Sequence, residues 1–263
     1  TAAEQSPSVI WTVGQADRSA SEFALAPDRF RDFLANDFGY EDKYFLVGHS
    51  VPAADFPYVL PGPADTWGGT WPTSGWRTHQ VNILFGLKEI PSDGTCTLVV
   101  DLLDYAKNFL PLVKVSVNTQ DAKFQLDAPG LSVADQRKPN QMEKIVDTLS
   151  ITGNLAKATP RRLEIPIRPG VLKAGGNEVT ITVLEGSWIL FDRVSLEGPA
   201  GTNVEQPQQL FIRNIEAAPY ELADGKRRVQ PLLVDLEWLE GAPALSVELD
   251  GKEILNQRIE TGR

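Results

Sequence analysis

Residues 186–198 have the sequence GSWILFDRVSLEG, and this stretch decides the predicted fold. In a β-strand, successive side chains point to opposite faces. The more apolar face carries Trp188, Leu190, Asp192, Val194 and Leu196. The less apolar face carries Ile189, Phe191, Arg193, Ser195 and Glu197. The pattern predicts a strand that closes an all-β sandwich and turns its first face into the core.

The carboxylate of Asp192 interrupts this apolar row. A buried, ionised carboxylate must be paired, hydrogen-bonded or bound to a metal. Two kinds of partner remain open for Asp192: backbone N–H groups of a neighbouring loop, or a bound cation.

Calcium is the candidate cation, because hard cations bind several oxygen ligands. Asp17 and Glu22 lie in a polar loop after a predicted first strand near residues 8–14. Since terminal strands of a sandwich often pair, Asp17, Glu22 and Asp192 form a candidate calcium site. A salt bridge from Arg18 to Asp192 or Glu22 is an equally simple interpretation.

Five further segments read as short strands, because they alternate apolar and polar residues or are almost continuously apolar: 81–87, 95–103, 113–117, 163–167 and 179–183. Such strands, with turn residues between them, are typical of sandwiches and barrels. No strand–helix–strand alternation indicates a doubly wound parallel sheet. The strand 178–184 is joined to the strand in 186–198 by a tight link, which predicts a hairpin.

A Gly- and Pro-containing stretch at 198–203 predicts a domain boundary. Residues 1–200 then form the sandwich, and residues 201–263 form a small or truncated β domain. Strand-like segments follow the boundary at 210–215, 229–239, 245–249 and 252–255. About four strands in about sixty residues make a sheet that is only marginally stable alone. The second domain is therefore small, or the chain is a fragment of a longer protein.

Composition excludes several classes of partner. The chain of 263 residues has a formal net charge of -10, which argues against nucleic acid and anionic membranes. Its one cysteine, Cys96, allows no disulfide within the chain and no multi-cysteine metal site. The start at Thr1 fits a mature end left after removal of a signal peptide, or a cloning boundary. The scarcity of cysteine fits an exported protein as well as a cytosolic one.

The segment 55–77 is the predicted binding loop. It contains four prolines, four glycines and three tryptophans, and a long irregular loop of this kind is usually functional or disordered. Indole and phenol rings pack against the C–H faces of pyranose rings, while polar groups bind the hydroxyls. The candidate ligand-binding residues are Tyr58, Asp65, Trp67, Trp71, Trp76, Arg77 and His79. The alternative is that these rings cover one end of the sandwich as a satellite core.

No arrangement in the sequence selects catalytic residues. The two histidines lack the spacing of a zinc site, and no glycine-rich phosphate loop precedes a helix. Carboxylates are plentiful, but nothing marks one pair as the acid and base of a glycosidase.

Several short stretches, in this order, resemble one family. Residues 10–23 resemble the Trp-x-Ile-Gly-x-x-Asp…Glu-Phe opening of the carbohydrate-binding-like domain of rhamnogalacturonan lyases and related accessory modules of carbohydrate-active enzymes. Residues 65–67, 81–87, 172–177 and 186–188, together with Asp192, follow in that family's order. The resemblance covers about residues 8–198.

This resemblance implies a jelly-roll (galactose-binding-like) β-sandwich, secreted and acting beside a polysaccharide-degrading catalytic domain. Residues 201–263 resemble, less specifically, the immunoglobulin-like linkers of such enzymes. The catalytic lysine and histidine of the lyases have no counterpart here. We therefore expect a non-catalytic accessory region that binds a polysaccharide or oligosaccharide, with a pectic glycan first. A fragment with its own lyase or glycosidase activity, or a purely structural spacer, remains the alternative.

Overall fold

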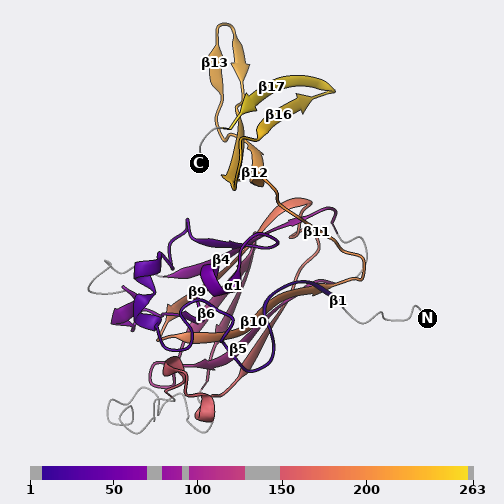
Figure 1. Cartoon of the computed structure of the whole chain (residues 1–263). Helices are drawn as coiled ribbons and strands as arrows, with labels where there is room; N and C mark the ends of the chain where they lie inside the picture. Colours follow the sequence, from indigo (N-terminus) through magenta and orange to yellow (C-terminus); the bar gives the residue numbers. More distant parts are fainter. Residues whose placement is uncertain (1–7, 70–78, 91–94, 128–148, 260–263) are drawn as a thin grey trace, which may run out of the picture.

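The structure is a computed structural model that describes residues 8–69, 79–90, 95–127 and 149–259. Two sheets form the body of the molecule (Figure 1). The first sheet has the order β1 (Ser8–Gly14), β10 (Ile189–Gly198), β5 (Thr97–Tyr105), β8 (Arg161–Pro166), and β3 (Val59–Leu60) also pairs with β10. All of these pairs are antiparallel.

The second sheet has the order β11 (Val204–Glu205), β4 (Gln80–Leu87), β9 (Gly175–Glu185), β6 (Leu112–Val117), β7 (Gln120–Gln125). A short strand, β2 (Tyr44–Leu46), pairs with β4 in parallel. Alternation in β4, β6 and β9 turns buried side chains such as Ile83, Val115 and Ile181 into the core. The predicted all-β jelly-roll sandwich is therefore confirmed.

Strand β10 lies in the middle of its sheet, between β1 and β5. Its pairing with β1 confirms that the two terminal strands of the sandwich meet. The expectation that only one face of β10 is buried was wrong, because Ile189, Phe191 and Ser195 of the other predicted face are also fully buried. The ring of Phe191 packs on Phe56 at 5.0 Å between ring centroids. The register against β5 shifts on both sides of Phe191, and this irregularity breaks the simple alternation.

The predicted hairpin of β9 and β10 was also wrong. Strand β9 pairs with β4 and β6 in the second sheet, whereas β10 pairs in the first. The link crosses the sandwich at Gly186, whose φ is +82° and whose missing Cβ leaves room for the backbone of Leu110. Both strands can then bury apolar side chains in the same core from opposite sides.

Helical segments are short. They are η1 (Phe30–Asp32), η2 (Leu34–Asn36), α1 (Pro52–Asp55), η3 (Thr66–Gly68), η4 (Ser150–Thr152) and η5 (Leu155–Lys157). In the part of the chain that the structure describes, no helix has the length and apolar character needed to cross a membrane.

Beyond the sandwich, three antiparallel pairs form a projecting part (Figure 1). The pairs are β12 (Leu210–Ala217) with β15 (Leu232–Trp238), β13 (Leu222–Asp224) with β14 (Arg227–Val229), and β16 (Ala244–Leu249) with β17 (Lys252–Arg258). Strand β11 still belongs to the second sheet of the sandwich, and the proposed division at residue 200 stays a prediction.

Candidate functional site

The described residues of the predicted binding loop are mostly buried. Tyr58 is 1% exposed, and its Oη donates a hydrogen bond of 2.6 Å to the Ile151 carbonyl oxygen. Burial is the main reason why the pKa of Tyr58 is raised. The carboxylate of Asp65 accepts hydrogen bonds from the Ser187 hydroxyl and the Gly62 N–H. These contacts hold the loop on the sandwich rather than presenting Tyr58 and Asp65 to solvent.

The aromatic rings of this loop pack on one another. His79 is 1% exposed and stands edge-on to Phe33 at 5.6 Å. Trp67 is half-buried and makes T-shaped contacts with Phe30 at 5.0 Å and Phe33 at 6.3 Å. In this structure Tyr58 belongs to the main core, Trp67 packs against that core, and Asp65 and His79 are buried, so for these four a role in ligand binding stays a prediction. Trp71, Trp76 and Arg77 lie outside the described residues, and their contact with a ligand stays a prediction.

The predicted calcium residues bind backbone N–H groups. Asp192 Oδ1 accepts from Arg18 N at 3.0 Å and Asp17 Oδ1 from Ser19 N at 2.9 Å, while Glu22 Oε1 accepts from Gln15 N at 2.9 Å. Within the described residues, no group of three or more His, Cys, Asp or Glu side chains is placed to hold a metal ion. For Asp192 the structure thus supplies the loop partner, and calcium stays an untested prediction.

Asp192 is nevertheless an unusual carboxyl. It is 7% exposed, and burial raises its pKa from 3.8 to about 6. The nearby charges of Asp17, Asp101 and Glu22 act in the same direction, and the Arg18 N–H acts against it. This group therefore changes its charge within the range of pH at which the protein can be studied.

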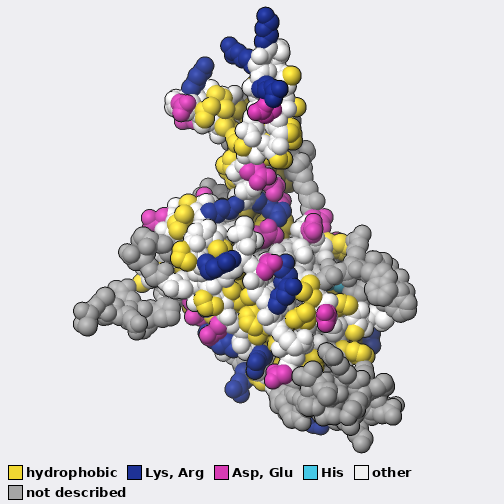
Figure 2. Space-filling model, turned by 180° about the vertical axis from the view of Figure 1, so that it is seen from behind, with side chains coloured by type: hydrophobic (Ala, Val, Ile, Leu, Met, Phe, Trp, Pro, Cys, Tyr) yellow, Lys and Arg dark blue, Asp and Glu magenta, His cyan; other side chains and the backbone are white. Residues whose placement is uncertain are grey.

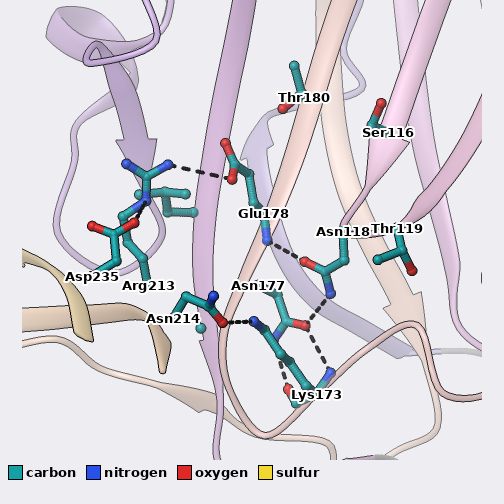
Figure 3. Close-up of a pocket in the computed structure, with 12 residues that line it drawn as sticks. Ser116, Asn118, Thr119, Lys173, Asn177, Glu178, Thr180, Arg213, Asn214 and Asp235 are labelled. Carbon is teal, nitrogen blue, oxygen red and sulfur yellow. Dashed lines mark hydrogen bonds and ion pairs between the residues drawn. The ribbon is translucent and has the colours of Figure 1, made fainter. Parts of the chain in front are cut away.

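A polar groove lies where the projecting strands meet the outer face of the second sheet (Figure 3). We call it the junction groove, and its volume is about 380 Å³. Its lining residues come from β4, β6, β9, β12 and β15 and from the loops beside them. They are Leu84, Ser116, Asn118, Thr119, Lys173, Gly176, Asn177, Glu178, Thr180, Arg213, Asn214 and Asp235.

Two paired glycines allow the junction groove to form. Gly86 of β4 lies opposite Gly176 of β9. A Cβ added to Gly176 would lie 2.5 Å from the carbonyl oxygens of Ile212 and Arg213, and one added to Gly86 would lie 2.9 Å from Glu205 Cβ. Strand β12 can therefore cross the sheet in direct backbone contact with β9.

An apolar contact beside the groove fastens β12 to the sheet. Phe211 is 4% exposed and forms a small cluster with Leu46 and Leu84, against which Tyr44 and Leu239 also pack. Burial of this ring contributes about 1.5–3 kcal/mol, and it anchors the projecting strands.

One arginine joins the walls of the groove (Figure 3). Arg213 Nη1 donates to Glu237 Oε1 at 3.0 Å, while Nη2 lies 3.5 Å from Glu178 Oε2 and Nε lies 3.9 Å from Asp235 Oδ2. Burial lowers the pKa of Arg213, but these carboxylates outweigh that effect and raise it. The guanidinium therefore holds carboxylates from β9 and β15 around a single point.

Side-chain amides fix the opposite wall. Asn177 Oδ1 accepts hydrogen bonds from Asn118 Nδ2 at 2.8 Å and from Lys173 N at 3.0 Å, and Asn118 Oδ1 accepts from Glu178 N at 2.9 Å. Lys173 Nζ donates to Asn214 Oδ1 at 2.9 Å, which links this loop to β12. The wall is rigid, because nearly every amide atom in it has a structural partner.

The outer part of the groove offers polar groups to a ligand. The side chain of Asp235 is 63% exposed and that of Glu178 is 39% exposed. Hydroxyls of Thr119, Thr180 and Ser116 lie along the sheet. No aromatic residue lines this groove in the described part of the chain. Its described lining therefore provides hydrogen-bonding groups and no stacking surface.

Sequence reasoning did not predict this groove. Its residues lie at Leu84, in the segments 116–119, 173–180 and 213–214, and at Asp235, and only the fold brings them together. The pairing of Gly86 with Gly176 was the available signal, but it is visible only once the register of β4 and β9 is known.

The jelly-roll sandwich places the protein in the carbohydrate-binding-like class. A family model described as CBM-like, polysaccharide lyase family 4, domain III, matches residues 9–196, and the chain belongs to this family. The predicted resemblance is therefore confirmed. The match ends before β12, so Arg213, Asn214 and Asp235 lie beyond it.

Other comparisons add little. No curated protein matches the chain. Among four matching chains of solved structures is a family GH115 4-O-methyl-alpha-glucuronidase with specificity for decorated arabinogalactans. It is 14% identical over 45% of this chain and 13% of that enzyme, with a TM-score of 0.25. The chain thus spans about an eighth of that protein's length.

Proposed function

We propose that this chain is a non-catalytic, carbohydrate-binding accessory module of a polysaccharide-degrading enzyme, and that the junction groove binds its glycan. The observation that carries the proposal is membership of the CBM-like family of polysaccharide lyases over residues 9–196. The groove supports it, because it combines rigid walls with exposed hydrogen-bonding groups.

The size of the groove supports a short glycan segment as ligand. Small-molecule sites have volumes of about 300–1,000 Å³, and the junction groove, at about 380 Å³, lies near the lower limit of that range. Sugar hydroxyls both donate and accept hydrogen bonds, so they match carboxylates such as Asp235 and hydroxyls such as Thr119 and Thr180.

The finer parts of this proposal rest on the resemblance to rhamnogalacturonan lyases. They are a pectic plant cell-wall glycan, a secreted or periplasmic location and a catalytic domain acting on the same polysaccharide. Trp71, Trp76 and Arg77 are proposed as a second contact with the glycan. Calcium at Asp17, Glu22 and Asp192 is proposed as structural.

Affinity electrophoresis and calorimetry of the whole chain against pectic and hemicellulosic polysaccharides test the function. We expect binding without release of shorter products. Asp235→Ala and Lys173→Ala should each weaken binding about tenfold or more, which corresponds to a loss of about 1.4 kcal/mol. Glu248→Ala on β16 is the matched control, because it removes an exposed carboxylate outside the groove.

Three other results would decide against parts of the proposal. Shortening of the polysaccharide would make the chain an enzyme. Binding that survives both groove variants but is lost in Trp71→Ala or Trp76→Ala would move the site to the predicted aromatic loop. Binding to no glycan would leave a structural spacer.

A further inference from the structure

We propose that the junction groove selects uncharged sugar residues and discriminates against uronates. This inference rests on the proposed function and narrows the glycan from pectic polysaccharides in general to their neutral parts. It is derived from the charges that the fold gathers in the groove.

The positive charge of Arg213, which could bind the carboxylate of a uronate, is already neutralised. The guanidinium of Arg213 faces the carboxylates of Glu237, Glu178 and Asp235 at 3.0, 3.5 and 3.9 Å. A further carboxylate entering the groove would have to displace one of them, and it would be repelled by the other two. Glu237 is 8% exposed, so this partner cannot move into water to make room.

Lys173 is the remaining cation among the described lining residues. Its Nζ donates to the neutral amide of Asn214 at 2.9 Å, in an exposed position. A single exposed ammonium gives a weak, salt-screened attraction. Counting Glu237 behind the arginine, the groove holds three carboxylates against two cations.

The exposed atoms suit hydroxyl groups. Carboxylate oxygens accept only, so Asp235 and Glu178 favour a ligand that brings O–H donors. A neutral hexose has such a donor at C6, whereas a uronate has a carboxylate there. Replacing that hydroxyl by a carboxylate removes a donor that Asp235 or Glu178 could accept from, and it adds repulsion between like charges.

The net charge of the whole chain also disfavours charged glycans. Its formal net charge is -10, so a polyanionic glycan such as galacturonan is repelled before it reaches the groove. The repulsion by the net charge of the chain must be separated from the repulsion within the groove, so the test needs a variant that changes the net charge outside the groove.

The test uses a galactan oligosaccharide and the same oligosaccharide with its C6 hydroxyls oxidised to carboxylates. Calorimetry of the whole chain in low salt should show the neutral form binding at least about tenfold more tightly. Asp235→Lys should raise the affinity for the oxidised form at least about tenfold, because it reverses a charge beside Arg213.

Glu248→Lys is the control, since it changes the net charge of the chain equally but lies on β16, outside the groove. This variant should leave the preference within about twofold of the parent. Equal shifts in both variants would attribute the preference to the net charge and overturn the inference.

Tighter binding of the oxidised form to the parent chain would also overturn the inference, while the proposed carbohydrate-binding function would stand. Failure of every glycan in the screen to bind would instead overturn the proposed function. Circular dichroism of each variant tests whether a loss of binding reflects unfolding.

Discussion

The sandwich and the projecting strands use the same local structure with different results. In the sandwich, two sheets face each other and bury residues such as Ile83, Val115 and Phe191 completely. In the projecting part, the strands are paired two by two. Among the described residues, ten of the fifteen large hydrophobic side chains that stay exposed belong to this part.

Figure 2 shows these hydrophobic side chains along the projecting strands. Alternation alone therefore makes strands, but a second layer is needed to remove their apolar face from water. A two-stranded pair is only marginally stable in water. The comparison teaches that Phe211, which β12 buries on the sandwich, stabilises the projecting part more than the apolar residues that this part leaves exposed.

The largest effect should come from the core of the sandwich. Phe191→Ala removes a fully buried ring that packs on Phe56 and leaves a cavity between the sheets. We expect a loss of about 3–5 kcal/mol in the free energy of unfolding, measured by urea denaturation followed by tryptophan fluorescence. A loss below 1 kcal/mol would mean that the core can collapse around the missing ring, contrary to the tight packing described above.

The next effect should fall on the junction between the two regions. Gly176→Val places side-chain atoms against the carbonyl oxygens of Ile212 and Arg213, so the backbone of β12 must move away from β9. We expect overpacking to cost about 1–3 kcal/mol and to release β12 while the sandwich stays folded. Faster hydrogen exchange in residues 210–217, with unchanged exchange in β5, measures this.

Gly170→Ala is a useful control for that variant, because a Cβ there meets no atom within 4 Å. Its positive φ of +79° still gives a small backbone cost, so it controls for loss of glycine but not for steric contact. Equal exchange in both variants would show that direct backbone contact does not hold β12.

The sequence also predicts more of the sandwich than of the projecting part. Alternation was sufficient to predict the strands of the sandwich, because apolar residues at every second position are typical of a strand that buries one face. It was insufficient at Phe191, where a register shift changes the facing of the strand, and at Gly186, where the chain changes sheets. Both depend on contacts between segments far apart in sequence.

The candidate site was harder still to predict. The tryptophan-rich loop was the local signal, but the packing of Trp67 on Phe30 and Phe33 depends on a separate segment near residue 30. The junction groove is assembled from residues up to 151 positions apart, such as Leu84 and Asp235. Ordinary polar residues of this kind carry no signal until the register of the strands brings them together.

A smaller effect, within the sandwich, should depend on pH. The pKa of Asp192 is raised from 3.8 to about 6, so the folded state binds its proton more tightly than the unfolded state. Its contribution is a destabilisation that is absent below about pH 4, grows between pH 4 and 6, and is complete above pH 6. Asp192→Asn keeps an oxygen that can accept the Arg18 N–H and removes the charge.

We therefore expect Asp192→Asn to raise the free energy of unfolding by about 1–2 kcal/mol at pH 7.5, and to leave it unchanged at pH 3.5. The same experiment tests calcium. If Asp17, Glu22 and Asp192 bind the ion, the variant loses stability at pH 7.5 and a chelator lowers the melting temperature of the parent chain. A chelator without effect on the parent would remove calcium from the proposal.

The smallest effect should come from the apolar face of the projecting strands. Ile254 on β17 is 55% exposed, so Ile254→Thr removes little buried area and keeps a β-branched side chain suited to a strand. We expect a change within about 0.5 kcal/mol, measured by the same urea denaturation as for Phe191→Ala. A loss above 2 kcal/mol would show that Ile254 is covered by another surface in solution, and the contrast between the two regions would then disappear.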